Sequence, residues 1–385
     1  MSSDIIQPIS VGELRAIIGD AIGDGAKLTI RGGGSRDGIG APPIETARIL
    51  DMRGFTGIVD YDPAELVLTA RSATPLADVL AIVAKEGQML AFEPFDPAPH
   101  QGAATIGGTI VAGAAGPLRL TRGGARDHLL AVKAVSGRGE EFVGGAKVVK
   151  NVTGYDLPKL IAGSWGRLAA VTEITLKVLP TPAVRVTCLL VGLSPRLAVA
   201  AMARALGSQA DVHAAAHIPA YAPFGGLPVT AMRVAGFAAS VAARCALLDT
   251  VLAEFGSLER VEGDACIALW NDVALAAPLD NIMPLWRISV PAREGAMVAE
   301  AIAGLNGQWM MDWGGGLVWA SVSAEADTIR TLAARTGGHA SLVRAPEAVR
   351  RVVTAFHPSA AGVSALEQRI RRAFDPAGVF ETGRF

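Results

Sequence analysis

The sequence predicts an α+β protein built from two parts, the second of which contains an antiparallel sheet. Its 385 residues are sufficient for two domains with sizeable cores. A long alternating strand pattern ends at Pro180-Thr181-Pro182, a run that marks a boundary. Beyond it, strand-like pieces alternate with alanine-rich helices, which is typical of one antiparallel sheet covered by helices. We therefore expect domains at 1–180 and 181–350, and C-terminal helices with a tail at 351–385 that return to the first domain.

The first domain is expected to open with a helix over 10–22. Ser10 and Glu13 have the spacing of a capping box, and apolar residues then recur on one face. A second helix is predicted from Thr74, as N-cap, and Pro75 to Gly87. The remaining elements are a long strand at 168–179, shorter strands at 27–31, 47–51, 57–61, 66–71, 129–135 and 141–149, and short helices at 108–115 and 156–162.

The second domain is predicted from its alternation of strand and helix patterns. Alanine-rich stretches separate short runs of β-branched and other apolar residues. The expected strands are 184–191, 229–235, 285–290, 317–323 and 339–344, and the expected helices are 196–206, 237–255, 293–303 and 324–335.

Two glycine-rich loops lie about seventy residues apart in the first domain. One is Arg31-Gly32-Gly33-Gly34-Ser35-Arg36, directly after a short apolar strand, and the other runs from Gly102 through Thr105, Gly107 and Gly108. Glycine lets backbone N–H groups approach a phosphate and adopts the left-handed turns that point several of them inward. One such loop can be a flexible turn, but two indicate a ligand with two linked phosphates. The ligand that we expect is FAD.

Two common phosphate-binding motifs are absent. A P-loop needs a Gly-Lys pair, and the chain contains none. A Rossmann fingerprint needs a third glycine where Asp37 stands. The loops therefore predict a different type of dinucleotide site.

Composition excludes several other functions. Lys and Arg total 35 against 36 Asp and Glu, and a net charge of -1 argues against a nucleic-acid partner. No apolar run is long enough for a transmembrane helix, and the N-terminus lacks the features of a signal peptide. Three scattered cysteines are too few for a four-thiolate iron–sulfur cluster and are typical of a reducing cytoplasm. No metal-site spacing is present, so we expect no metal and a cytoplasmic protein.

A turn around Ser164 and Gly166 is a further candidate for ligand binding. It lies between a helix and a strand, the reverse of the order in a hydrolase nucleophile elbow, so a catalytic serine is not expected. We expect Ser164 and Gly166 to face a polar ligand, with Val171 and Thr172 on the adjacent strand edge; an ordinary helix-to-strand turn is the alternative. Asp127 is expected to cap or brace the stretch before it.

His339 and Arg344 are the candidate catalytic residues, and they share one predicted strand. Arginine binds a carboxylate through its planar fork, and histidine can accept a proton near neutral pH. Their offset of five residues puts them on opposite faces of a regular strand, so a shared site needs a bulge. The alternative is that both are ordinary surface residues.

Taken in order, these motifs resemble a known family. The two loops, Arg126-Asp127, the block Asn151–Leu157, and Gly163-Ser164-Trp165-Gly166 with Val171-Thr172-Glu173 are similar to the FAD domain of the p-cresol methylhydroxylase type, in the vanillyl-alcohol oxidase superfamily. The block Asn151–Leu157 and Asp375–Phe380 further resemble the FAD-binding subunits of bacterial glycolate oxidases.

The resemblance implies a two-part FAD-binding domain, followed by an α+β cap or substrate domain. It implies that FAD is held non-covalently, since Ser35 stands where covalently linked relatives use histidine. It also implies hydride transfer from a small 2-hydroxy acid, within a complex that contains a second flavin subunit and an iron–sulfur subunit. Peripheral association with the inner face of the membrane would then come through those partners. The cofactor-binding residues that we expect are Arg31, Gly32, Gly33, Gly34, Ser35, Arg36, Gly102, Thr105, Gly107, Gly108, Asp127, Ser164, Gly166, Val171 and Thr172.

Two other functions remain open on the sequence. The chain can be a flavin-bearing assembly subunit without turnover of its own, or a stand-alone FAD oxidase of another alcohol. Activity of the isolated chain, compared with activity in the presence of partners, separates the assembly subunit from a subunit that oxidises glycolate. Bleaching of the flavin by a small panel of substrates tests the stand-alone oxidase.

Overall fold

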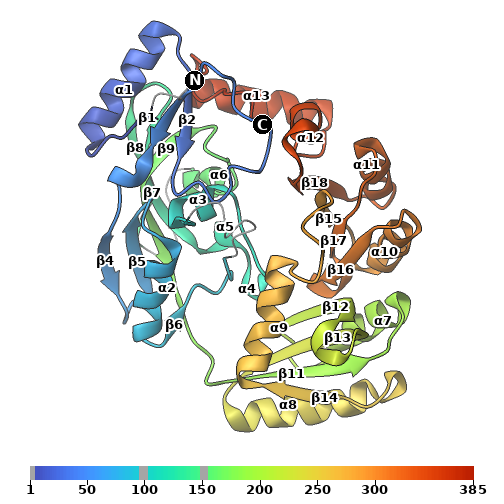
Figure 1. Cartoon of the computed structure of the whole chain (residues 1–385). Coiled ribbons are helices and arrows are strands. Elements are labelled where there is room, and N and C mark those ends of the chain that lie inside the picture. The colour runs from blue at the N-terminus through green and yellow to red at the C-terminus, as the bar shows by residue number, and fades with distance from the viewer. Residues whose placement is uncertain (1–4, 95–102, 148–154) are drawn as a thin grey trace. The chain divides into compact units, whose positions relative to one another are not determined.

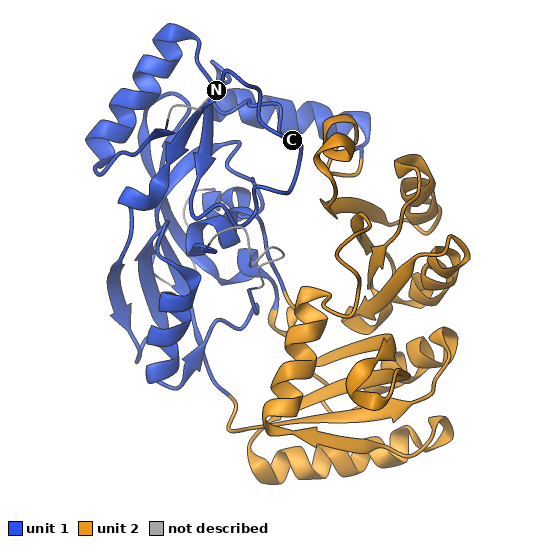
Figure 2. Ribbon diagram, viewed as in Figure 1, with its two compact units in different colours: residues 1–115, 123–181, 358–385 blue, residues 116–122, 182–357 orange. Residues whose placement is uncertain are grey.

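The computed structural model describes residues 5–94, 103–147 and 155–385. It divides the chain into two compact units, shown in Figure 2. Unit 1 contains residues 1–115, 123–181 and 358–385, and unit 2 contains 116–122 and 182–357. The chain therefore crosses between the units four times. The sequence places its main boundary at 180/181, and it gives no sign that 116–122 belongs with the second unit.

Unit 1 begins with a small parallel sheet and one helix (Figure 1). The predicted capping box forms in part: Ser10 Oγ accepts the N–H of Glu13 at 3.2 Å, while the Glu13 carboxylate accepts from Ile9 instead of Ser10. Leu14 and Ile18 are fully buried against the sheet. The elements are β1 (Ile5–Ile6), α1 (Val11–Asp24), β2 (Leu28–Arg31) and β3 (Arg48–Asp51), in strand order β1-β3-β2.

A five-stranded antiparallel sheet forms the rest of the core of unit 1. Its long strand β9 (Ala169–Lys177) lies between β5 and β7, and seven of its nine residues are buried. The strand order is β4 (Ile58–Asp62), β5 (Val67–Arg71), β9, β7 (Leu129–Ser136) and β8 (Glu141–Gly145). Beside it lie η1 (Met52–Gly54), α2 (Leu76–Lys85), α3 (Ile106–Val111), α5 (Ala125–His128), α6 (Leu157–Ile161) and the two-stranded pair β6 (Gln88–Met89) and β10 (Leu179–Pro180).

The start of α2 differs from the prediction. Pro75 is the N-cap, and no side chain caps the helix. Thr74 Oγ1 bonds instead to the backbone of Gly57 and Arg71, across the neighbouring turn. The threonine hydroxyl therefore joins two chain segments instead of capping the helix.

The C-terminal segment returns to unit 1 as helix α13 (Ala361–Phe374) and a tail. The buried carboxylate of Asp375 accepts the N–H groups of Val379 and Phe380 at 2.8 and 2.7 Å. The Val379 carbonyl in turn accepts the N–H of Leu28 on β2. The tail is thus bonded to the strand that leads into the first glycine loop.

Unit 2 is an eight-stranded, fully antiparallel sheet with helices. The α+β class predicted from sequence is therefore confirmed. The strand order is β14 (Glu259–Glu262), β11 (Val184–Val191), β13 (Leu227–Gly236), β12 (Ala214–Tyr221), β16 (Gln308–Asp312), β17 (Leu317–Ser321), β15 (Leu285–Ser289) and β18 (His339–Arg344). The helices are α4 (Arg119–Arg122), α7 (Pro195–Leu206), α8 (Ala238–Val251), α9 (Gly263–Leu275), α10 (Gly295–Gly304), α11 (Ala326–Arg335) and α12 (Glu347–Val352), with short 3₁₀ turns η2 (Ala222–Phe224), η3 (Ala253–Phe255), η4 (Ala292–Glu294) and η5 (Trp313–Gly315).

The two faces of this sheet carry different helices. Buried residues of α7, α8, α10 and α11 form one core with alternate strand residues such as Cys188, Trp286 and Ile288. Helix α9 lies on the other face, where Trp270 Nε1 donates to Thr187 Oγ1 at 2.8 Å. The end of the sheet formed by β17, β15 and β18 is thus apolar toward the first set of helices and carries polar side chains on its second face.

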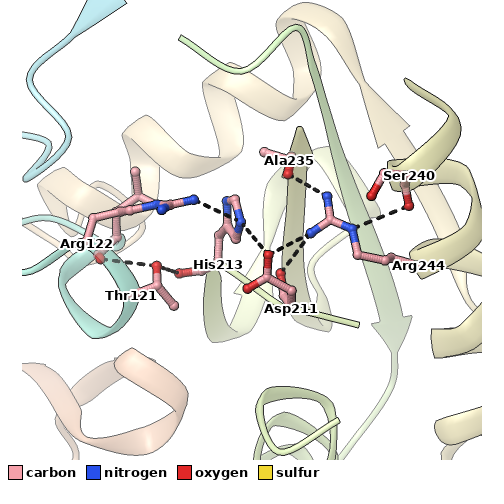
Figure 3. Close-up of polar contacts among 8 residues, drawn as sticks. Thr121, Arg122, Asp211, His213, Ala235, Ser240 and Arg244 are labelled. Carbon is pink, nitrogen blue, oxygen red and sulfur yellow. Dashed lines mark hydrogen bonds and ion pairs between the residues drawn. The ribbon is translucent and has the colours of Figure 1, made fainter. Parts of the chain in front are cut away.

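The segment 116–122 is a short excursion of the chain out of unit 1, and polar contacts hold it to the rest of unit 2 (Figure 3). Thr121 Oγ1 donates to the His213 carbonyl at 2.8 Å, and Arg122 lies 3.3 Å from His213 Nε2. The Asp211 carboxylate lies 3.3 Å from the same Nε2 atom and pairs with Arg244 at 2.9 Å. Burial and the charge of Arg122 lower the pKa of His213. A neutral imidazole can therefore accept from Arg122 at neutral pH.

Candidate functional site

The first glycine loop follows directly from β2 and leaves backbone donors available. Gly34 has φ of +81°, a conformation that favours glycine. Within the described residues, the N–H groups of Gly33, Gly34 and Ser35 donate no hydrogen bond. Backbone N–H groups are obligatory donors, so three neighbouring ones without acceptors indicate a place for an anion.

The two glycine-rich loops are in contact. A Cβ on Gly33 would lie 1.6 Å from the carbonyl oxygen of Ala103, and one on Gly32 would lie 2.6 Å from Thr105 Oγ1. Glycine is therefore required at both positions by close approach. The structure brings together the two loops that the sequence paired.

Within the second loop, the N–H groups of Gly107 and Gly108 already donate hydrogen bonds. Thr105 is the N-cap of α3, and its Oγ1 accepts the N–H of Gly108 at 3.2 Å. Gly107 donates to the Ser72 carbonyl at 2.7 Å, and a Cβ there would lie 2.6 Å from the same oxygen. The second loop thus supplies shape and packing, while the first loop supplies free donors. Gly102 lies outside the described residues.

The turn 163–166 packs against α3. Its residues Gly163, Trp165 and Gly166 all have positive φ, and Trp165 donates its N–H to the Val111 carbonyl at 2.8 Å. The Trp165 indole is stacked obliquely on Phe385, with ring centroids 5.0 Å apart. Ser164 is buried, and its Oγ has no hydrogen-bond partner within the described part of the chain.

The other predicted residues lie behind these loops. Val171 and Thr172 are buried in β9, and the Thr172 carbonyl accepts from Ser72, the residue that binds Gly107. The Asp127 carboxylate accepts the N–H of Gly124 at 2.8 Å, so it braces the stretch that precedes it.

Two adjoining hollows of unit 1 lie at this site. The smaller hollow, of about 80 Å³, is bordered by both glycine loops, and its charged lining is three arginines against Asp37. The larger hollow, of about 610 Å³, has four arginines against Glu381. The residues common to both are Ile30, Trp165, Arg384 and Phe385; the smaller is also lined by Arg31–Asp37, Thr105, Gly108 and Val111, and the larger by Leu28, Thr29, Ile44, Gly166, Arg167, Gln368, Arg371, Arg372 and residues 380–383.

The excess of arginine in both hollows favours a bound anion. In the larger hollow, burial and the charge of the neighbouring Arg371 lower the pKa of Arg167, and the ion pair of Arg167 with Glu367 at 2.9 Å opposes this effect. Arg31 pairs with Asp37 at 2.8 Å. Arginines therefore outnumber carboxylates where the unused N–H groups lie.

The C-terminal tail contributes residues that sequence reasoning missed. Arg384 Nε donates to the Ile39 carbonyl at 2.9 Å, and its Nη2 donates to the Arg36 carbonyl. Ala41 donates to the Arg384 carbonyl at 3.0 Å. Arg384 therefore fixes the chain that leaves the first loop. No local pattern signals this, because more than 340 residues separate the partners.

The candidate catalytic pair in unit 2 has a different setting from the one expected. A register shift between Leu285 and Trp286 puts Arg344 opposite Leu285 and Ser341 opposite Arg287. The bulge therefore places His339 and Arg344 on one face. Arg344 donates to the Asp280 carbonyl at 2.6 Å, whereas the unpredicted Arg287 lies diagonally across from His339.

Comparison with known proteins agrees with this geometry. A family model described as an FAD binding domain matches residues 3–144. The structure of p-cresol methylhydroxylase with substrate bound superposes with a TM-score of 0.73 at 13% identity, covering 99% of this chain and 88% of that one. An alkyldihydroxyacetonephosphate synthase gives a TM-score of 0.68 at 14% identity, covering 97% and 75%. The fold is that of the p-cresol methylhydroxylase type, and the chain carries an FAD binding domain.

Sequence relatives identify the family to which the chain belongs. Over 374 residues the chain is 35% identical to glycolate oxidase subunit GlcE of Escherichia coli (strain K12), and the match covers 95% of each protein. It is 30% identical over 180 residues to a D-lactate dehydrogenase of Anaerostipes hadrus, covering 46% of this chain and 36% of that protein. The chain belongs to the family of glycolate oxidase subunit GlcE, and its cofactor is FAD.

The described residues fit this cofactor. Three free N–H donors, a close approach that excludes Cβ atoms and an excess of arginine are the features that a diphosphate requires. The larger hollow has a volume within the usual range for small-molecule sites, about 300–1,000 Å³. Thr29 Oγ1, at its edge, is a buried hydroxyl without a partner among the described residues.

Proposed function

We propose that this chain is the FAD-binding subunit of a complex that oxidises glycolate or a closely similar 2-hydroxy acid. The observation that carries the proposal is the 35% identity to a glycolate oxidase subunit along 95% of both chains. Partial matches to D-lactate dehydrogenases support a 2-hydroxy acid as substrate class.

The proposed cofactor contacts follow from the hollows. Gly33, Gly34 and Ser35 would donate their N–H groups to the diphosphate, with Arg31 and Arg36 beside it. Thr105, Gly108 and the turn at Gly166 would enclose the nucleotide, while Ser164, Val171, Thr172 and Asp127 would support these loops from behind. The larger hollow has room for the adenosine half, and the Thr29 hydroxyl would bond to it.

Bound FAD supplies an electron sink that can take a hydride from the α-carbon of a hydroxy acid. The chain itself would bind the nucleotide without a covalent bond. The reason is that Ser35, which lines the smaller hollow, stands where covalently linked relatives use histidine. Within unit 2, the pKa of His339 is lowered by desolvation and by the charges of Arg287 and His357. A neutral His339 can accept the hydroxyl proton of a substrate.

We further propose that electrons leave for an iron–sulfur subunit, in a complex that includes a second flavin subunit. The chain has three cysteines, Cys188, Cys245 and Cys266, all buried and free, so a four-thiolate cluster would have to lie on a partner. None of the described helices combines the length and apolar character needed to cross a bilayer. A cytoplasmic site at the inner face of the membrane, reached through the partners, is consistent with this assignment.

One observation favours a second candidate, a flavin-bearing subunit without turnover of its own. Arg344, the arginine expected to hold a substrate carboxylate, is committed to the Asp280 carbonyl. If this reading holds, the substrate is oxidised on another subunit.

The absorbance spectrum of the purified protein, before and after glycolate addition, tests the proposal. Bound flavin and bleaching by glycolate with the isolated chain support an active subunit. Bound flavin that bleaches only when the partner subunits are present supports the second candidate. Protein that releases no flavin on denaturation contradicts both.

A further inference from the structure

The second face of the sheet in unit 2 carries a cluster of cationic and aromatic side chains. In β15, Trp286 and Ile288 point into the helix-covered core, so Arg287 points to the opposite face. The neighbouring β18 places His339 on this same face, as a diagonal neighbour of Arg287. The cluster is thus built from strand residues, whose positions the sheet fixes.

Trp313 is the centre of this cluster. It begins η5, immediately after β16, with a positive φ of 53°. Its Nε1 donates to the Gly116 carbonyl at 3.1 Å, and the side chain is buried. A bulky residue adopts positive φ at a cost in free energy, so this indole is held in place by its surroundings.

Two arginines lie against the same indole ring. The Arg287 Cζ is 4.8 Å from the ring centroid, and the Arg119 Cζ of α4 is 5.1 Å from it. Each contact lies within the range of a cation–π interaction. Two cations on one ring also repel each other, so the indole alone does not compensate their charge.

Arg287 lacks the partners that a buried charge requires. Among the described residues, no oxygen accepts a hydrogen bond from its guanidinium, and no carboxylate lies within ion-pair distance. Burial, followed by the charge of Arg119, lowers the pKa of Arg287 to about 10, although Asp312 opposes this. The side chain is still charged at neutral pH, and an unpaired charge is costly even when it is only half-buried.

A purely structural role does not use all of this arrangement. A guanidinium stacked on an indole contacts it through its face and leaves its five in-plane N–H donors for other partners. As a whole residue Arg287 is half-buried and not completely closed off from solvent. A planar, bidentate acceptor is the chemistry that this fork recognises best.

We propose that Arg287 and Arg119, held by Trp313, bind the carboxylate of a small organic acid, with His339 next to the group on its α-carbon. The anion site follows from the arginines themselves. Its assignment to a 2-hydroxy acid rests on the proposed function, since His339 would accept a hydrogen bond from the hydroxyl. Arg287 thereby takes the role that the sequence suggested for Arg344.

The test is calorimetric titration of glycolate into the FAD-loaded protein. Wild type is compared with Arg287→Met, Arg287→Lys and Arg119→Ala, and with Arg335→Ala at the exposed end of α11 as the control. We expect Arg287→Met to weaken glycolate binding at least 30-fold, the other two cluster variants to weaken it less, and the control to bind as wild type. Flavin content should be the same in all five proteins.

Several results would overturn the proposal. These are glycolate binding by Arg287→Met within twofold of wild type, or no glycolate binding by wild-type protein that retains flavin. If Arg287→Met fails to fold, wild-type affinity of Arg287→Lys has the same meaning, because lysine keeps the charge but loses the fork. Displacement of glycolate by inorganic phosphate at equal concentration would reject a carboxylate site. Loss of flavin from wild type contradicts the proposed function instead, so the two failures are distinguishable.

Discussion

Replacing Gly33 by alanine should separate the two glycine loops and weaken FAD binding. The added Cβ would lie 1.6 Å from the Ala103 carbonyl oxygen, whereas ordinary contact begins at about 3.4 Å. The loops must therefore move apart by about 1.8 Å, the difference between these distances. Gly33 does not have a positive φ, so the alanine backbone itself is unstrained and the clash is the main effect.

The size of the effect follows from hydrogen-bond geometry. A shift of this size exceeds the whole range of normal N–H···O lengths, so one or two bonds from the first loop to a phosphate are lost. Each charge-assisted bond contributes about 1.5 kcal/mol or more, and about 1.4 kcal/mol corresponds to tenfold in affinity. We expect FAD to bind about 10- to 100-fold more weakly to Gly33→Ala.

Flavin fluorescence titration of the apoprotein measures this loss, and thermal unfolding of the apoprotein separates it from misfolding. Gly19→Ala is the matched control, because Gly19 is exposed in α1 with nothing within 4 Å of its Cβ position. That variant should bind FAD normally and be slightly more stable, by about 0.5–1 kcal/mol. If Gly33→Ala retains wild-type affinity for FAD, the loops do not form the diphosphate site.

Three further predictions concern other parts of the molecule. Thr29→Val should leave the apoprotein as stable as wild type, because the buried hydroxyl has no partner, but should weaken FAD binding about tenfold; equal affinity in a fluorescence titration would separate Thr29 from the cofactor. Arg384→Ala should speed FAD release, measured by stopped-flow displacement, with Arg384→Lys intermediate, since lysine keeps the charge but lacks the fixed fork that bonds the Arg36 and Ile39 carbonyls; unchanged release in both variants would reject this. Burial lowers the pKa of His217 to about 4, so the unfolded chain takes up a proton below about pH 6.5 before the folded one does. The free energy of unfolding should therefore fall on acidification, by about 2 kcal/mol at pH 5 from this residue; in urea titrations the fall between pH 7 and pH 5 should be smaller by about this amount in His217→Gln than in wild type, and an equal fall in both proteins would contradict the assignment.

Features that depend on neighbouring residues could be predicted from the sequence. The Ser10–Glu13 cap and the strands β11 and β18 follow from local spacing and alternation, and both strands have the predicted bounds. The glycine loops could be paired because both have the composition of a phosphate site, and they lie in contact. Local chemistry was sufficient in each case.

Features that depend on distant residues could not be predicted. The strand β12 begins with three alanines and contains a proline, so its β structure comes from pairing with β13 and β16. Arg384 acts on a loop more than 340 residues earlier, and Arg287 has no motif around it. The burial of Arg287 comes from Trp313 and from the excursion that carries Arg119, which no periodicity reveals.

The excursion 116–122 has a consequence for anyone who wishes to study the second unit alone. A fragment that begins at 182 would lack the carbonyl of Gly116 that bonds Trp313, the hydroxyl of Thr121 and the guanidinium of Arg122 at His213. A recombinant unit 2 therefore has to be spliced, with this heptapeptide grafted back, before its ligand binding can be judged. Because unit 2 consists of two separate stretches of the chain, cleavage at a single position cannot release it whole.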